Sequence, residues 1–404
     1  MSRRLPSVLM ASALALALAL VGCDRGAGRA TITLWHAWGG IELAGLKETL
    51  SAFRDAHPDV EVVALQVPSD KLQDKYLRST AANGGPDLVL GATDWVGKFA
   101  QSEVIMPLDA VVKQSDLSPY LGVALDALRY EGKLYALPES LETLALYYNK
   151  RLVTGQVPAT VQDLFTLANS RDYYRGDYLL AYNTQFFFTA GYLFGMGGGL
   201  FDPKGGVALS GSGAERWLTL LRDLKRHPRI AAKSDYGRAD GLFRDGKAAM
   251  TINGPWALGG YRQVLGDALG VAPMPMVEEG VPAVPFVGVK CVMFNPNTDP
   301  SQRSRALELA LALTGAEASE RMRREAGHIP ALRGAKIPEG DRLEAFAQQA
   351  RWGAPLPPNP EMKEVWAPMD EAIEKVLTDV APPKAALSAA REVISAKIEA
   401  VRKQ

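Results

Sequence analysis

The chain has 404 residues and a hydrophobic content of 47%, which suits about two to three domains with a sizeable core. Its 45 Lys and Arg residues balance its 45 Asp and Glu residues. This balance gives no reason to expect nucleic acid or an anionic membrane surface as the main partner, and it favours a neutral ligand.

The N-terminus has the organisation of a secretory signal. Arg3 and Arg4 precede an Ala/Leu-rich stretch, residues 5–21, and Leu20-Val21-Gly22-Cys23 has the form of a bacterial lipobox. A transmembrane anchor is the alternative, but the apolar stretch is shorter than the ~20 residues that a spanning helix needs. We therefore predict that residues 1–22 are a cleaved signal peptide.

The same motif predicts that Cys23 is lipidated and that residues 23–30 tether the protein to the membrane. The protein would then be extracytoplasmic, and Asp24 would favour the periplasmic face of the inner membrane in a Gram-negative host. Only Cys291 is left after processing, so we expect no intrachain disulfide.

The first part of the mature chain alternates between strand and helix patterns. The predicted elements are strands at 31–35, 60–65 and 87–90, a helix that ends before Pro58, and a helix from an N-cap at Ser69 to about Ala82. This alternation indicates a parallel sheet.

A second α/β unit follows a helical region at 118–128 and extended segments at 135–138 and 144–149. Its predicted elements are a helix capped by Thr160, a strand at 178–181, a helix at 213–226, a strand at 248–252, a helix opened by Asp299 and Pro300, and helices at 363–377 and 385–401. We expect the chain to cross between the two units near 139–143 and 285–289.

Enzyme signatures are absent from the sequence. None of the four histidines has His-Glu-x-x-His spacing, and no Gly-x-Ser-x-Gly occurs. The loop Gly241–Lys247 resembles a phosphate-binding loop, but Ala248 follows it where a magnesium-binding hydroxyl is required. We therefore predict no catalytic residue, no metal and no cofactor.

Trp256 lies just past a predicted strand end, because Asn253-Gly254-Pro255 stops the apolar run 248–252. In open α/β sheets ligands gather at such ends, although an isolated Trp is more often part of a core. The run from Gly246 to Trp256, with Pro285-Phe-Val-Gly-Val289, resembles the maltose/maltodextrin-binding proteins of ABC sugar importers. The resemblance can be followed from Thr31 to the C-terminus.

This resemblance implies an α/β, two-lobed periplasmic binding protein fold (type II) with discontinuous lobes joined by a hinge. The expected lobes are residues 31–140 plus 288–333, and residues 141–287 plus 334–404. It also implies a monomer whose partners are an oligosaccharide and the membrane subunits of an ABC permease.

The matching motifs imply ligand-binding roles for five side chains, each with a structural alternative. Trp256 and Trp366 would stack on sugar rings, Asp94 and Glu142 would accept hydrogen bonds from hydroxyls, and Lys71 would lie at the cleft rim. The alternatives are a core position for either Trp, a helix N-cap for Asp94, a solvated loop charge for Glu142 and an exposed helix charge for Lys71.

The sequence also departs from the family. Trp38 replaces a charged pair, Trp95 follows Asp94 where the family has Arg, Phe188 lies where the family has an acidic segment, and Asp370 replaces an Arg. We therefore expect a ring-rich site, including Trp38, Trp95 and Phe188, for an α-gluco oligosaccharide. The alternative function is a secreted glycoside hydrolase acting on α-glucans, with Glu142 and Asp94 as its carboxylate pair.

Overall fold

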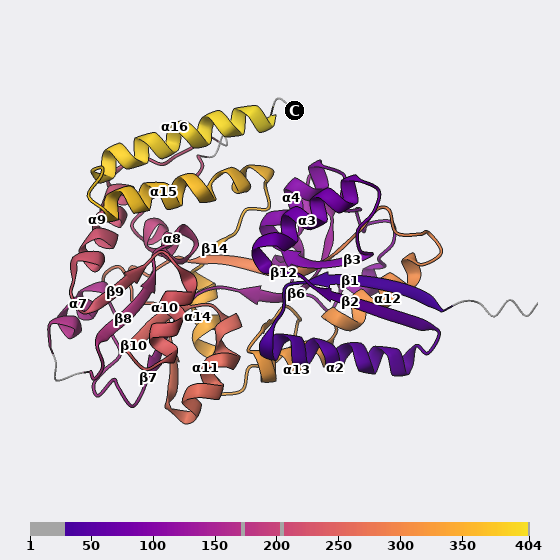
Figure 1. Cartoon of the computed structure of the whole chain (residues 1–404), viewed down its shortest axis with the longest axis horizontal. Helices are drawn as coiled ribbons and strands as arrows, with labels where there is room; N and C mark the ends of the chain where they lie inside the picture. Colours follow the sequence, from indigo (N-terminus) through magenta and orange to yellow (C-terminus); the bar gives the residue numbers. More distant parts are fainter. Residues whose placement is uncertain (1–28, 171–173, 203–205, 403–404) are drawn as a thin grey trace, which may run out of the picture.

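The computed structural model describes residues 29–170, 174–202 and 206–402, so the predicted signal peptide and Cys23 lie outside the described residues. The protein has two lobes, each built around its own β-sheet, and extended segments of the chain connect the two lobes (Figure 1). This arrangement agrees with the two α/β units that the sequence predicts.

The first sheet has seven strands in the order β13-β6-β12-β3-β1-β2, with β14 paired to β12. Its strands are β1 Ala30–His36, β2 Val60–Gln66, β3 Leu88–Ala92, β6 Ala136–Glu142, β12 Phe286–Phe294, β13 Ile329–Pro330 and β14 Ala354–Pro355. Strand β1 pairs in parallel with β2 and β3, whereas β12 pairs antiparallel to β3 and β6. A late strand therefore lies in the middle of a sheet that begins at the N-terminus.

The second sheet has five strands in the order β11-β7-β10-β8-β9. They are β7 Ala145–Asn149, β8 Tyr178–Asn183, β9 Ile230–Lys233, β10 Ala248–Asn253 and β11 Leu269–Ala272. Strand β8 is parallel to both β9 and β10, so these three strands end at the same edge. A small hairpin, β4 Arg129–Tyr130 and β5 Lys133–Leu134, stands apart from both sheets.

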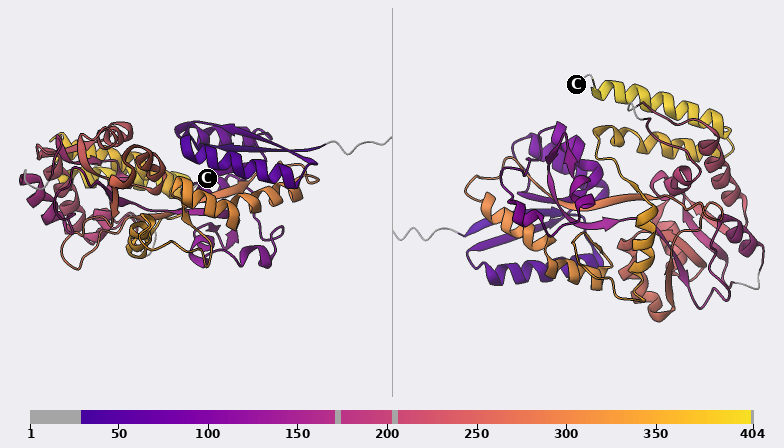
Figure 2. Two further views of the ribbon diagram at one scale, coloured as in Figure 1. Left: turned by 90° about the horizontal axis from the view of Figure 1, so that it is seen from below. Right: turned by 180° about the vertical axis from the view of Figure 1, so that it is seen from behind.

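Helices cover both sheets (Figures 1 and 2). Around the first sheet lie α2 Gly40–Ala56, α3 Ser69–Ala81, α4 Thr93–Gln101, α5 Gln114–Leu117, α6 Gly122–Asp126, α12 Arg303–Thr314 and α13 Ala316–Ala326. Around the second lie α7 Val161–Asn169, α8 Phe186–Gly195, α9 Ser212–Arg226, α10 Tyr236–Arg244, α11 Leu258–Leu265, α14 Leu343–Trp352, α15 Trp366–Leu377 and α16 Pro383–Arg402. Three 3₁₀ segments are η1 Pro255–Ala257, η2 Gly266–Ala268 and η3 Pro360–Glu364.

The structure confirms one predicted helix start and shows that two others are wrong. Thr160 accepts from the Asp163 backbone N–H at 3.1 Å and Asp163 returns the bond at 3.0 Å, a capping box. The predicted cap at Asp299 is wrong, because its carboxylate binds Ser301 within a turn and α12 begins only at Arg303. Ser69 is the first residue of α3 rather than its cap. The predicted helical region 118–128 contains one short helix, α6, after a turn.

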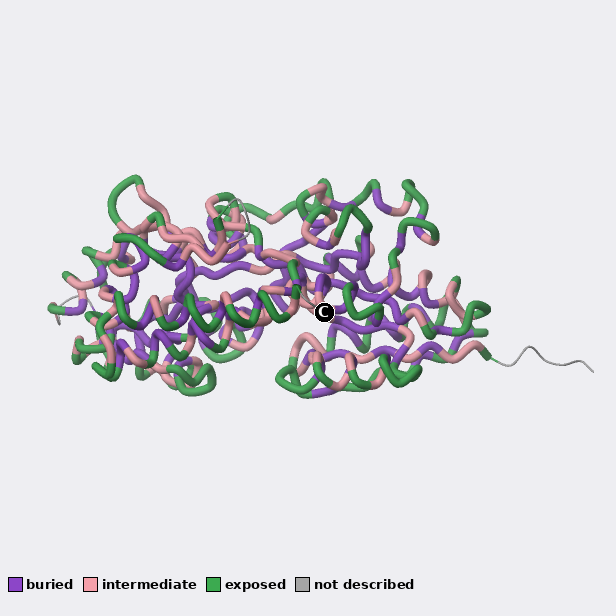
Figure 3. Tube along the Cα trace, turned by 90° about the horizontal axis from the view of Figure 1, so that it is seen from above, coloured by how far each residue is buried: buried purple, intermediate pink, exposed green. Residues whose placement is uncertain are grey.

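Each lobe has its own hydrophobic core, and burial continues along the strands that connect them (Figure 3). Five consecutive residues of β6 and most of β12 are buried. Helices α11 and α13 also touch, because Arg262 donates to the carbonyls of Arg324 and Glu325 at 2.7 and 2.8 Å. None of the helices in the described part of the chain is both long and apolar enough to cross a membrane.

Candidate binding site

A cavity of about 360 Å³ lies between the two lobes. This volume falls in the range of roughly 300–1,000 Å³ that is usual for small-molecule sites. Its first-lobe wall includes Trp38, Glu42 and Trp95, Lys290 of β12 lies at its base, and its second-lobe wall includes Tyr236 and Trp256. The cavity therefore joins aromatic rings from both lobes with one carboxylate and one ammonium group.

The first-lobe wall is built at the carboxyl ends of two parallel strands. Trp38 follows β1, and Trp95 lies in the first turn of α4, directly after β3. A Cβ atom on Gly91 would lie 2.5 Å from the Trp95 ring, so the absence of a side chain there lets the indole cross β3 closely. Trp38 is nearly buried, with 6% of its surface exposed.

The second-lobe wall forms where β10 ends. A Cβ atom on Gly254 would lie 2.1 Å from the ring of Trp256, so this glycine allows the indole to fold back over the turn. The hydroxyl of Tyr236 accepts hydrogen bonds from the Trp256 Nε1 at 3.2 Å and from the Asn253 amide at 3.3 Å. Its own proton is then available for a ligand oxygen.

Trp256 and Trp366 belong to one aromatic cluster of the second lobe. The ring of Phe187 lies between them, with centroid distances of 6.1 Å to Trp256 and 6.3 Å to Trp366. Phe188 packs 5.9 Å from Tyr236 and is only 7% exposed. Phe188 therefore supports the cavity wall from behind, and the rings that face Trp256 across the gap are Trp38 and Trp95.

Asp94 contacts the second lobe through Trp366, with which it shares a side-chain hydrogen bond. Burial raises the pKa of Asp94 to about 6, and the charge of Glu142 acts in the same direction, against this bond and one from the Asp94 backbone. The alternative reading of Asp94 as an N-cap is wrong, because Ala92 is the N-cap of α4.

A row of charged side chains adjoins the cavity, half-buried at Glu42, Lys290 and Glu142 and buried at His328 and Glu139. The Lys290 Nζ is 2.8 Å from Glu42 Oε1 and 3.3 Å from Glu142 Oε1. His328 lies 3.0 Å from the same Glu42 oxygen through Nε2 and 2.8 Å from Glu139 through Nδ1. Glu142 is thus an ion-paired residue at the end of β6 rather than a solvated loop charge.

The charges of this row shift one another's pKa values. Burial alone would raise the pKa of Glu42, but the charge of Lys290 and the hydrogen bond from His328 lower it to about 2. Burial opposes the positive charge of Lys290, yet Glu42 and Glu142 raise its pKa well above the ordinary value. Glu42 and Lys290 are therefore both ionised at neutral pH.

Of the predicted residues, Trp38, Trp95 and Trp256 line the cavity. Asp94, Glu142, Phe188 and Trp366 do not line it and lie beside its walls or the charged row, whereas Lys71 lies away from both. Its ammonium is exposed and pairs with Asp70 at 3.1 Å, although Ser69 and Leu72 of the same helix line the cavity. The sequence reasoning missed Glu42, Tyr236 and Lys290. Lys290 carried a signal, because it is a single charge inside the apolar run 287–294 and a buried charge needs a partner.

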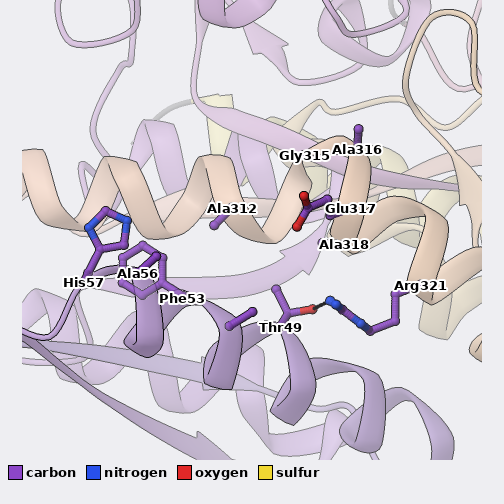
Figure 4. A pocket seen from close by; sticks show the side chains of 11 residues that line it. Thr49, Phe53, Ala56, His57, Ala312, Gly315, Ala316, Glu317, Ala318 and Arg321 are labelled. Atoms are coloured by element: carbon purple, nitrogen blue, oxygen red, sulfur yellow. Dashed lines mark hydrogen bonds between the residues drawn. The ribbon is translucent and has the colours of Figure 1, made fainter.

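A second hollow of about 300 Å³ lies between α2 and the junction of α12 with α13 (Figure 4). Its lining consists largely of alanines, and Arg321 donates to the Thr49 hydroxyl at 2.9 Å while pairing with Glu48 at 3.3 Å. No tryptophan lines it, so the inter-lobe cavity is the better candidate site. Within the described residues, no group of three or more His, Cys, Asp or Glu could hold a metal ion.

Comparisons with known proteins agree with this architecture. Residues 48–348 match the family model described as bacterial extracellular solute-binding protein. A maltotriose-binding protein of Pyrococcus abyssi (strain GE5 / Orsay) is 28% identical over 364 residues, covering 87% of this chain and 78% of the relative. A galactooligosaccharide-binding protein of Bacillus subtilis (strain 168) is 27% identical over 373 residues, covering 88% and 87%.

Among solved structures, the Thermus thermophilus maltotriose binding protein bound with maltotriose is similar, with a TM-score of 0.82 and 31% identity. The match covers 91% of this chain and all of that one. The chain therefore belongs to the bacterial extracellular solute-binding proteins. Its two-lobed α/β fold is confirmed, and it is a binding protein rather than a glycoside hydrolase.

Proposed function

We propose that this protein is the lipid-anchored substrate-binding component of an ABC importer and captures maltodextrin-like α-gluco oligosaccharides. The observation that carries the proposal is the inter-lobe cavity with Trp38 and Trp95 on one wall and Trp256 on the other. Aromatic rings pack against the C–H faces of a pyranose, and Glu42, Lys290 and Tyr236 supply polar groups for its hydroxyls. The names of the similar proteins support the same ligand class.

Ligand capture would work by closing the lobes. A sugar held between Trp95 and Trp256 completes its contacts only when both walls are close, so binding shifts the population toward the closed state. The ABC permease would then recognise the closed monomer. Residues 31–140 plus 288–333 and residues 141–287 plus 334–404 are our proposed lobes.

The test is a titration of the purified protein with maltose to maltoheptaose, followed by Trp emission and calorimetry. Galacto-oligosaccharides form the comparison series, because a relative is named for them. Saturable binding of the α-gluco series is expected. Binding of the galacto series alone would overturn the α-gluco assignment. Absence of binding to both series would overturn the proposal that the ligand is a sugar.

The anchor requires a separate test. Replacing Cys23 with Ser removes the thiol that lipidation needs, so the parent protein is expected to incorporate labelled fatty acid during growth and the mutant protein is expected to incorporate none. A Cys291→Ser protein is the matched control. Equal labelling of parent and Cys23→Ser proteins would contradict the anchor.

A further inference from the structure

Five side chains of alternating charge connect the joining strands to the cavity wall. In order they are Glu139 of β6, His328, Glu42 of α2, Lys290 of β12 and Glu142 of β6. His328 reaches this row because Gly327 ends α13 with a φ of 81°, and the His328 backbone N–H returns to the Met322 carbonyl.

The distances around His328 define its protonation state. Its Nδ1 lies 2.8 Å from Glu139 Oε1 and its Nε2 lies 3.0 Å from Glu42 Oε1. A neutral imidazole has one N–H and would turn a lone pair toward the other carboxylate. His328 and Glu139 are 3% and 2% exposed, so water has little access to relieve that repulsion. Only the imidazolium donates to both carboxylates.

The row leaves one oxygen of Glu42 for a ligand. Both Lys290 and His328 bind Oε1, and no hydrogen bond to Oε2 is found within the described part of the chain. Glu42 lines the cavity and its side chain is 17% exposed. Two cations on one oxygen therefore fix the direction of the other, which is an acceptor for a sugar hydroxyl.

The same two cations hold Trp38. The ring of His328 meets it edge-on at 5.3 Å, and the Lys290 Nζ lies 6.0 Å from its centroid. Burial of ion pairs is weak evidence for a role in stability, since apolar residues of similar volume often serve as well. A role at the cavity accounts for charges at this place.

We propose that His328, as a doubly protonated imidazolium, is a positioning residue that holds Glu42 and Trp38 in place for the ligand. The proposal rests on the proposed function in that the ligand is the maltodextrin. Loss of one proton from His328 breaks its bond to one of the two carboxylates and turns a lone pair toward that carboxylate. Glu42 and Trp38 are then held less firmly, by Lys290 alone or by a displaced imidazole, and affinity falls.

The charged groups that face His328 are Glu139, Glu42 and Lys290, with Glu142 beyond Lys290. Burial would lower the pKa of His328, but the two carboxylates raise it to about 9. The pKa of Lys290 lies far above this value, and burial raises the pKa of Tyr236. His328 is therefore the group of this row that titrates between pH 8 and 10.

The experiment measures maltotriose affinity from pH 6 to 10. The parent protein is expected to keep its affinity to about pH 8 and to lose about tenfold by pH 10, the equivalent of one charge-assisted hydrogen bond. His328→Gln keeps an N–H toward Glu42 without a titrating proton, so its affinity is expected to be weaker at pH 7 and flat above it. Glu139→Gln is expected to move the fall to lower pH.

His57→Gln is the matched control, because His57 stacks on Phe53 at the C-terminal end of α2, whereas Glu42 lies in its first turn. Its profile is expected to equal that of the parent. The proposal is wrong if His328→Gln retains the parent's fall in affinity with pH. Imidazole nitrogen NMR of the ligand-free protein is a second test of the proposal. Both nitrogens of His328 are expected to carry protons at pH 7.5.

These readouts separate the two proposals. If no sugar binds to the parent protein at any pH, the proposed function fails, and the NMR titrations of the parent and Glu139→Gln proteins still decide the state of His328. A neutral ring at pH 7.5 would overturn the inference even where maltotriose binds tightly.

Discussion

The indole nitrogen of Trp256 donates a hydrogen bond to the hydroxyl of Tyr236 across 3.2 Å. The two residues come from different elements, η1 and α10, and both line the inter-lobe cavity. The bond restrains the orientation of the indole, which packs over Gly254 and still lines the cavity. A ligand ring that stacks there meets a surface that is already oriented, which reduces the entropy lost on binding.

Replacing Trp256 with Ala is expected to weaken maltotriose binding by about 1–3 kcal/mol, the usual size for a central aromatic contact. Calorimetry measures the change, and thermal unfolding verifies that the fold is intact. An affinity equal to that of the parent protein would remove Trp256 from the site.

Replacing Tyr236 with Phe retains the ring and removes the hydroxyl that orients Trp256. The expected loss is smaller, about 0.5–1.5 kcal/mol of binding free energy, the net value of one neutral hydrogen bond. The double mutant Tyr236→Phe/Trp256→Ala is expected to lose less than the sum of the single effects, because the two side chains act together. Strict additivity would contradict the coupling.

Lys71→Ala is expected to leave maltotriose affinity within about twofold, because the ammonium is exposed and pairs with Asp70 outside the cavity. The same titration measures it. A tenfold loss would show that Lys71 reaches the ligand after closure.

Replacing Lys290 with Met leaves Glu42 and Glu142 without their shared cation. Breaking a buried pair from one side costs about 3–5 kcal/mol of folding free energy, so a large loss is expected in urea denaturation. Lys71→Met is the matched control and is expected to change little. Adding Glu42→Gln to Lys290→Met is expected to recover part of the loss.

Three groups with shifted pKa values are expected to make stability depend on pH. Glu42, with its pKa lowered to about 2, contributes stability that is complete above its ordinary 4.5 and is lost as pH falls through 2. His328, with its pKa raised to about 9, contributes stability that is complete below its ordinary 6.5 and is lost as pH rises through 9. Asp94, with its pKa raised to about 6, lowers stability as pH rises from its ordinary 3.8 through 6.

Urea denaturation at pH 3, 5.5 and 9.5 measures this profile. The free energy of unfolding is expected to be clearly lower at pH 9.5 than at pH 5.5, because His328 has lost its proton, whereas the gain from Glu42 and the loss from Asp94 offset each other between pH 3 and 5.5. In the His328→Gln protein the free energy of unfolding is expected to fall less between pH 5.5 and 9.5. A parent protein that is most stable at pH 9.5 would contradict the raised pKa of His328.

The sequence predicted strands β1, β2, β3, β7, β8 and β10 because hydrophobic periodicity is local, but it did not predict the short strands β9 and β11. It also placed Trp256 at a strand end, since Asn253-Gly254-Pro255 cannot continue β10. The start of α12 was wrong because Asp299 closes a turn with Ser301 that has the same composition as a helix cap.

The charged row could not be predicted, since Glu42 and Lys290 are separated by 248 positions and only the fold brings them together. The sequence predicted that Asp94 and Trp366 bind the ligand, but it did not predict that the two side chains interact with each other. The sequence pattern also could not predict which way the Lys71 side chain points, because neighbouring residues on a helix point to different sides.

Strand β12 lies between β6 and β3 in the middle of the first sheet. Until residue 294 has been synthesised, β12 cannot pair with β3 and β6, so strands β1, β2 and β3 are not joined to β6 in one sheet. A fragment that stops before β12 is therefore expected to lack a complete first sheet, however many of the N-terminal residues it contains.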